Sequence, residues 1–181
     1  MKFRQNLRNV AIGVAATVSL LAAVPAYIII WNPRLLDQFI HPPHLSDRDL
    51  IANFHRHHAE FEQLRDMILR DKGLLRVTSD LTWPEDPQTI GIPSSRIAEY
   101  RGLLKKLGIQ GGIAVSSDQE NIELTTSFRG FITHGSQKGY LYTSESTPKY
   151  LVAGLDRFSQ SGVGGGWVHV DGNWYLFFEG Y

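Results

Sequence analysis

Apolar residues at helical spacing dominate the chain between residues 47 and 72. They recur at intervals of three, four and seven positions, at Leu50, Phe54, Phe61, Leu64 and Ile68. This spacing predicts one amphipathic helix with a single buried face. Ser46 lies where a helix cap is expected, and Gly73 lies where a left-handed stop is expected.

A second helix is predicted over residues 94–107. Its apolar positions follow the same rule, at Ile97, Tyr100, Leu104 and Leu107. Ser94 or Ser95 can cap its start, and Gly108 can end it. A shorter helix is predicted over residues 146–158, because Pro148 suits the first position of a helix.

Alternation of apolar and polar residues predicts strands in the rest of the domain. One strand is expected at 74–79, before a proline-rich loop, and the others form three hairpins, over residues 113–128, 130–145 and 165–179. The second hairpin is expected to turn at residues 135–138, and GVGGG at 162–166 is expected to be a flexible connector. The sum is an α+β domain with an antiparallel sheet of about five to seven strands, packed by two main helices and one short helix.

The pattern of the first 46 residues is different. No residue between Arg8 and Arg34 is charged, and residues 10–31 are almost wholly apolar. A helix of that length spans about 33 Å, which matches the hydrocarbon core of a bilayer. Tyr27 and Trp31 suit the aromatic belt at a membrane interface, and the basic residues near the start favour a cytoplasmic N-terminus. We therefore predict one N-terminal transmembrane helix.

This helix divides the chain into four parts. They are a cytoplasmic basic tail at 1–9, the transmembrane helix at 10–31, a stem at 32–46 and a periplasmic domain at 47–181. The protein is then a single-pass protein of the inner membrane, and the membrane is its first partner. The alternative is a signal peptide that is cleaved after Ala26. Against cleavage, the apolar run resumes as YIIIW, so the mature chain would begin with an exposed apolar peptide.

Charge and cysteine content exclude some functions. The chain has 18 basic and 18 acidic residues, and without residues 1–31 there remain 15 basic and 18 acidic residues with no basic run. Such a balance gives little attraction for a phosphate backbone, so no nucleic-acid partner is expected. The chain has no cysteine, which excludes disulfides, so the domain must be stabilised by its core. No cofactor is expected.

Four blocks of the sequence resemble a family of small bacterial envelope proteins. The blocks are DKGLLRVTSDLTWPEDP, SSRIAEYRGLLKKLGI, GSQKGYLY and GNWYLFFE. Members of this family carry an N-terminal membrane anchor or an export signal. The resemblance covers about Phe54 to Glu179 and implies that the domain faces the periplasm. It implies no activity, because the family offers no catalytic residues to carry over.

The histidine-rich stretch FHRHHAEFE at residues 54–62 is the first chemical candidate. On one helix, His55, His58 and Glu62 share an arc of about 60°, and two imidazoles with a carboxylate are ligands that zinc accepts. The stretch lacks the His-Glu-x-x-His spacing of catalytic zinc helices, and two arginines lie close by. We therefore expect a partly exposed helix flank without metal, and a hydrogen-bonded core histidine at His57.

The stretch THGSQK at residues 133–138 is the second candidate. A serine beside a histidine or a lysine is the minimum arrangement for an activated nucleophile, which points to His134, Ser136 and Lys138. Residues so close together on a hairpin turn rarely face one another, and Gly, Ser and Lys are common turn residues. We therefore favour a turn over a catalytic site.

Exposed aromatic residues are the third candidate. Trp83 lies in the proline-rich loop at residues 80–93, which is stiff and so costs little entropy to order. In the last hairpin, alternation places Trp174 on one face of the sheet and Tyr175 and Phe177 on the other. One face should be core, and the other is either covered by a helix or exposed as an aromatic patch. Trp83, Tyr175 and Phe177 are therefore the candidate binding residues.

Two functions fit these observations. The favoured one is a membrane-anchored periplasmic binding or interaction module without catalytic activity, such as an inhibitor, an immunity-type protein or an envelope-maintenance protein that binds another protein. The alternative is a periplasmic hydrolase, which would use the histidines with a metal ion or the THGSQK stretch. The sequence favours the first because it assembles no complete set of catalytic residues.

Overall fold

The computed structural model describes residues 43–116, 120–131, 134–144 and 150–180. The chain divides into two units, residues 1–42 and residues 43–181, and only the second is described. The predicted transmembrane helix and most of the predicted stem lie outside the described residues. Among the described residues, no helix is long and apolar enough to cross a membrane.

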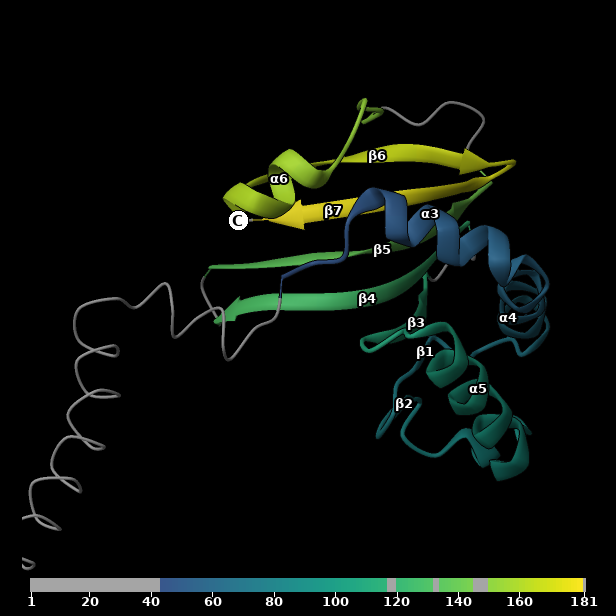
Figure 1. Cartoon of the computed structure of the whole chain (residues 1–181). Helices are drawn as coiled ribbons and strands as arrows, with labels where there is room; N and C mark the ends of the chain where they lie inside the picture. The colour runs from purple at the N-terminus through teal and green to yellow at the C-terminus, as the bar shows by residue number, and fades with distance from the viewer. Residues whose placement is uncertain (1–42, 117–119, 132–133, 145–149, 181) are drawn as a thin grey trace, which may run out of the picture. The chain divides into compact units, whose positions relative to one another are not determined.

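The second unit contains both helices and strands (Figure 1). The helices are α3 (Asp47–Arg56), α4 (His58–Arg70), the 3-10 helix η1 (Pro87–Ile90), α5 (Ser94–Leu107) and α6 (Asp156–Ser161). The strands are β1 (Arg76–Val77), β2 (Thr82–Trp83), β3 (Gly112–Val115), β4 (Asn121–Phe131), β5 (His134–Thr143), β6 (Gly164–Asp171) and β7 (Trp174–Gly180). They form one sheet in the order β2-β1-β3-β4-β5-β7-β6, and every neighbouring pair is antiparallel. The predicted α+β class with an antiparallel sheet is confirmed.

The register of the strands separates two faces of this sheet, because directly paired residues point to the same side. One row across the sheet comprises Val77, Ile113, Leu124, Tyr140 and Leu176. All five side chains are at most 1% exposed and belong to the main core, to which residues of α3, α4 and α5 also contribute. We call this side of the sheet the helix face.

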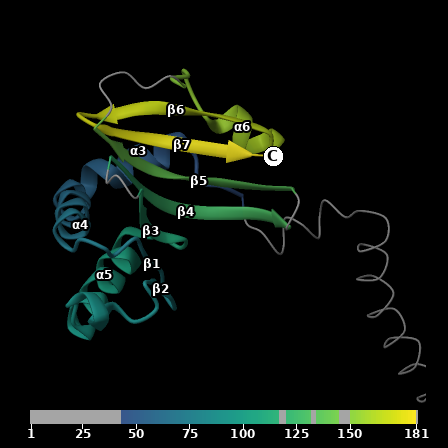
Figure 2. The ribbon, with the colours of Figure 1, turned by 180° about the vertical axis from the view of Figure 1, so that it is seen from behind.

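The adjacent row lies on the opposite side, which we call the open face. It crosses all seven strands and comprises Trp83, Arg76, Ala114, Glu123, Leu141, Tyr175 and His169. Seen from behind, in Figure 2, strands β4, β5 and β7 have no described helix drawn across them. The open face has a small buried cluster of its own, which consists of Leu141, Tyr175 and Phe177 with Trp167 packed against it.

The first predicted helix is interrupted at His57. Ser46 caps its start as predicted, since its hydroxyl accepts a hydrogen bond from the N–H of Asp49 at 3.1 Å. At His57 the backbone leaves the helical region, with φ −121° and ψ 27°, and a second helix begins at His58. The side chain of His57 is 23% exposed, so the prediction of a core histidine was wrong. The second main helix ends as predicted, with Gly108 in the left-handed conformation.

Two predicted boundaries between strands lie inside strands. The strands expected to end at Phe128 and to begin at Gly130 are continuous there, as parts of β4, which carries a bulge between Thr125 and Ser127. Residues 135–138 lie within β5, so the prediction of a turn there was wrong. The alternation of apolar and polar residues does not reveal this strand, because the polar residues Ser136 and Lys138 occupy buried positions on it.

The segment before β6 also differs from the prediction. The helix expected at 146–158 begins only at Asp156, and Leu151 instead forms a parallel bridge with Trp167. Gly164 to Gly166 belong to β6 and are not a flexible connector. A side chain at Gly166 would approach Val152 to 2.9 Å, so this glycine lets the preceding segment lie against β6.

Candidate functional site

A hollow of about 740 Å³ opens at the end of the open face formed by β1, β2 and β3. Its lining comprises Leu75, Arg76, Asp80, Leu81, Thr82, Trp83, Glu85, Arg101 and Ala114. Three of these residues, Trp83, Arg76 and Ala114, are consecutive members of the row that crosses the open face. The hollow is therefore continuous with that face. At its rim the side chains of Trp83 and Leu81 are 63% and 54% exposed.

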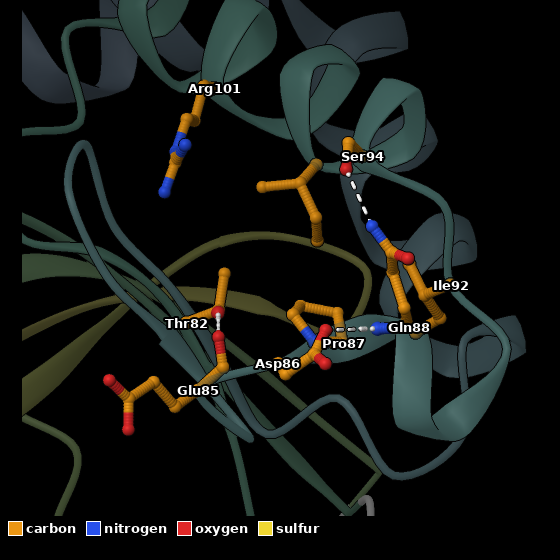
Figure 3. Close-up of a pocket in the computed structure, with 9 residues that line it drawn as sticks. Thr82, Glu85, Asp86, Pro87, Gln88, Ile92, Ser94 and Arg101 are labelled. Atoms are coloured by element: carbon orange, nitrogen blue, oxygen red, sulfur yellow. Dashed lines mark hydrogen bonds between the residues drawn. The ribbon is translucent and has the colours of Figure 1, made fainter.

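The loop that carries Trp83 is fixed by its own hydrogen bonds. Thr82 Oγ1 donates to the carbonyl of Glu85 at 3.1 Å, and the backbone N–H of Gln88 donates to the carboxylate of Asp86 at 3.1 Å. The side-chain amide of Gln88 donates to Ser94 Oγ at 3.2 Å, which ties the loop to the start of α5. Figure 3 shows these bonds around a second cavity, of about 210 Å³. These hydrogen bonds and the prolines both restrain the loop that carries Trp83.

Arg101 extends from α5 into the space between the helix and the loop. It lines both of these cavities and a third of about 530 Å³. Its Nε donates to the carbonyl of Thr78 at 3.0 Å, which orients the guanidinium. Figure 3 shows the terminal nitrogens pointing into the cavity above Thr82, whereas the carboxylate of Glu85 points away from them. Among the described residues these nitrogens make no hydrogen bond or ion pair.

Two of the predicted binding residues are buried. Tyr175 and Phe177 are 8% and 2% exposed, and they pack with Leu141 and Trp167 on the open face. The ring centroids of Trp167 and Tyr175 lie 6.2 Å apart. No described helix covers this cluster in Figure 2, and its centre is buried, with the rings of Trp167 and His169 packed against Tyr175. Tyr175 and Phe177 therefore do not form an exposed binding surface, contrary to the prediction. Of the three candidate binding residues only Trp83 is exposed.

A carboxyl group lies between the hollow and this cluster. Glu123 is paired with Ala114 on one side and with Leu141 on the other. Burial raises the pKa of Glu123, and the charge of Glu179 raises it further, whereas Arg76 lowers it. The open face therefore carries charges of both signs next to its aromatic residues.

Lys138 lies on the helix face of β5 and is completely buried. Its Nζ is 2.8 Å from a carboxylate oxygen of Asp47 and 2.9 Å from one of Asp156, and it donates to the carbonyl of Leu45 at 2.8 Å. Burial alone would raise the pKa of Asp156, but hydrogen bonds from Lys138 and from the Asp47 N–H lower it below its ordinary value. Lys138 therefore holds the first residues of α3 and α6 on the sheet.

Ser136 contacts a histidine that the sequence did not point to. His44 Nε2 is hydrogen-bonded to Ser136 Oγ at 2.9 Å, and His44 Nδ1 to Ser127 Oγ at 2.6 Å. The ring of His44 also meets the ring of Phe178 edge-on. Burial lowers the pKa of His44 to about 4, and the charges of Arg129 and Lys138 add to the effect.

A hydrogen-bonded serine and histidine are the parts of a nucleophile and its base. Here a base with a pKa of about 4 is too weak for efficient proton transfer near neutral pH. Ser136 and His44 are each 8% exposed, and neither lines any of the three cavities above. The geometry favours a structural contact between residues 44–47 and the sheet. The backbone of His134 is in β5, and its side chain lies outside the described residues.

The histidine stretch is divided between two helices. His58 Nε2 lies 3.9 Å from a carboxylate oxygen of Glu62 and 3.7 Å from one of Asp171, and the side chain of His55 is exposed. Glu62 is engaged elsewhere, since it accepts a hydrogen bond from Trp174 Nε1 at 2.6 Å and pairs with Arg65. Within the described ranges, no group of three His, Cys, Asp or Glu side chains is placed to hold a metal ion.

The chain matches no protein-family model, no curated protein and no solved structure. The resemblance to bacterial envelope proteins therefore stays a prediction.

Proposed function

We propose that this protein is a membrane-anchored periplasmic interaction module, which binds another protein through the surface around Trp83. We call this surface the Trp83 surface and define it as Leu81, Trp83, Arg76 and Arg101 with the hollow between them. Such a module would act as an inhibitor, as an immunity-type protein or in envelope maintenance. Its activity would be the capture of its partner, without a chemical step.

One observation carries this proposal. A tryptophan that is 63% exposed lies at the rim of a hollow of about 740 Å³, on a loop that its own hydrogen bonds fix. Exposed apolar residues that lie together are uncommon on monomeric surfaces, and here Leu81 lines the same hollow; tryptophan is also enriched at interaction hot spots. A surface that is already ordered loses little entropy on binding, so more of the contact energy appears as affinity.

Replacement of Trp83 by alanine is expected to reduce partner capture in intact cells by about 10-fold or more, because hot-spot truncation typically costs about 2 kcal/mol. Capture is measured with a photo-crosslinking amino acid at position 81, in the wild type and in the Trp83→Ala variant. The matched control is Tyr150→Ala, since Tyr150 is 66% exposed and lies beside β6, at the other edge of the sheet. Equal crosslinking in the Trp83 variant, or an equal loss in the control, would contradict the proposal.

The anchoring part of the proposal depends on the apolar run at residues 10–31. We expect a periplasm-active reporter fused after Tyr181 to be active and the intact chain to resist alkaline extraction from membranes. A version with two arginines at positions 20 and 21 should lose both properties, because each charge at a helix centre opposes insertion by about 2.5 to 3.5 kcal/mol. A reporter that is active only in the cytoplasm would contradict the assigned orientation.

A further inference from the structure

We infer that Arg101 is a receptor for a carboxylate of the partner, so that the partner presents an acidic side chain beside an apolar one. This inference rests on the proposed function, because it assigns a chemistry to the partner of the Trp83 surface. The apolar side chain of the partner would contact Trp83 and Leu81. Its carboxylate would enter the cavity into which the guanidinium of Arg101 points.

The guanidinium of Arg101 has donors that are free within the part of the chain that the structure describes. Arg101 is half-buried, its Nε is used by Thr78, and its two terminal nitrogens have no partner among the described residues. Other arginines of this chain pair with carboxylates, as Arg96 does with Asp71 at 2.7 Å and with Glu99 at 2.9 Å. A guanidinium with two free, parallel donors matches a carboxylate in geometry as well as in charge.

Two of the three carboxylates in the loop opposite Arg101 are already engaged. Asp80 accepts hydrogen bonds from the hydroxyls of Thr78 and Ser79, which lower its pKa, and Arg101 attracts it only from a distance. Asp86 accepts the N–H of Gln88 and caps η1. Asp80 and Asp86 are therefore held by the loop itself, and Figure 3 shows the carboxylate of Glu85 pointing away from Arg101. Arg101 and Arg76 both line the hollow.

Covering Arg101 with a partner costs solvation free energy. A partner that packs on Trp83 also covers the cavity beside it and removes water from the guanidinium. A buried cation without a counter-ion loses several kcal/mol of solvation, whereas a carboxylate in hydrogen-bonding contact restores it. A partner that offers only apolar or basic side chains would thus bind weakly, and an acidic one would be selected.

Two labelled peptides test this inference on the full-length protein in detergent micelles. One contains alternating leucine and glutamate residues, and the other has lysine at every glutamate position. We expect fluorescence anisotropy to show at least about 10-fold tighter binding of the glutamate peptide, and Arg101→Gln to abolish that preference. Arg101→Lys should retain part of it, because the charge remains and the paired donors do not. The matched control is Arg48→Gln, on the exposed side of α3.

The outcomes separate this inference from the function it rests on. Equal or tighter binding of the lysine peptide, or a preference that survives Arg101→Gln, would overturn the carboxylate receptor. If Trp83→Ala still weakened both peptides in that case, the Trp83 surface would stand without it. If neither peptide bound the wild type, the carboxylate receptor would be overturned, and the crosslinking experiment would decide the proposed function separately. Arg101→Lys guards against a variant that merely fails to fold, since it keeps the cation beside Thr78.

Discussion

Replacement of Lys138 by methionine is expected to lower the free energy of unfolding by about 3 kcal/mol. Methionine fills a similar volume but leaves the carboxylates of Asp47 and Asp156 without the cation that pairs with both. It also leaves the carbonyl of Leu45 without its donor. Asp47 carries most of the loss, because its side chain is only 15% exposed, whereas that of Asp156 is 49% exposed and is partly screened by water. Urea unfolding followed by near-ultraviolet circular dichroism measures the change.

Two further variants make this result specific. Lys138→Met combined with Asp47→Asn and Asp156→Asn should recover most of the stability, because neutral amides keep the hydrogen bonds and need no counter-ion. Lys105→Met, at an exposed position of α5, should change the stability by less than about 0.5 kcal/mol. If Lys138→Met were as stable as the wild type, Lys138 would have no structural role, and the hydrolase alternative would gain support.

The same ion pair explains where reasoning from the sequence failed. THGSQK reads as a turn because serine, glycine and lysine are turn residues, and a lysine is rarely expected at a core position of a strand. The compensating partners, Asp47 and Asp156, lie 91 and 18 positions away in the sequence, and no local pattern indicates that they meet. His44 was missed for the same reason, because its two serine partners are on β4 and β5.

Several signals that depend on neighbouring residues agree with the structure, although the cap expected at Ser94 or Ser95 does not, because Pro93 precedes α5 without a side-chain cap. The apolar positions of α5, the cap at Ser46, the stop at Gly108 and the last hairpin all agree with the structure. Alternation also separated Trp174 from Tyr175 and Phe177 correctly. Alternation could not predict that Tyr175 on the open face is buried, since this depends on Trp167 and His169 of the neighbouring strand. The break at His57 likewise has no strong local signal, because neither glycine nor proline lies near it.

The exposure of Trp83 could be predicted from the proline-rich loop in which it lies. The role of Arg101 could not be predicted from the sequence. Its place in the sequence, between Tyr100 and Leu104 on an amphipathic helix, is typical of a solvated arginine. Its importance comes from the loop that lies opposite, which leaves a cavity at the end of its side chain. A site formed between a helix and a loop is thus visible only when both have been placed.

Lowering the pH from 7 to 4 is expected to reduce the free energy of unfolding of the wild type by about 2 to 3 kcal/mol more than that of His44→Gln. The ordinary pKa of His44 is 6.5, and burial with the charges of Arg129 and Lys138 lowers it to about 4 in the folded protein. Above pH 6.5 the ring is neutral in both states and has no effect. Between these values only the unfolded chain binds the proton, so stability falls as the pH falls, and below pH 4 the loss is complete.

Glutamine is the informative replacement at His44, because its amide can donate to one serine and accept from the other but cannot be charged. Carboxylates such as Asp156 also lose stabilisation in acid, so the comparison is the difference between the two unfolding profiles and not the wild-type profile alone. Arg48→Gln is the control, since it lies at an exposed position of α3 and its profile should match the wild type. Parallel profiles for the wild type and His44→Gln would contradict a buried neutral ring between Ser127 and Ser136. A steeper profile for the wild type is the expected result, because protonation of the ring between Ser127 and Ser136 then opposes folding.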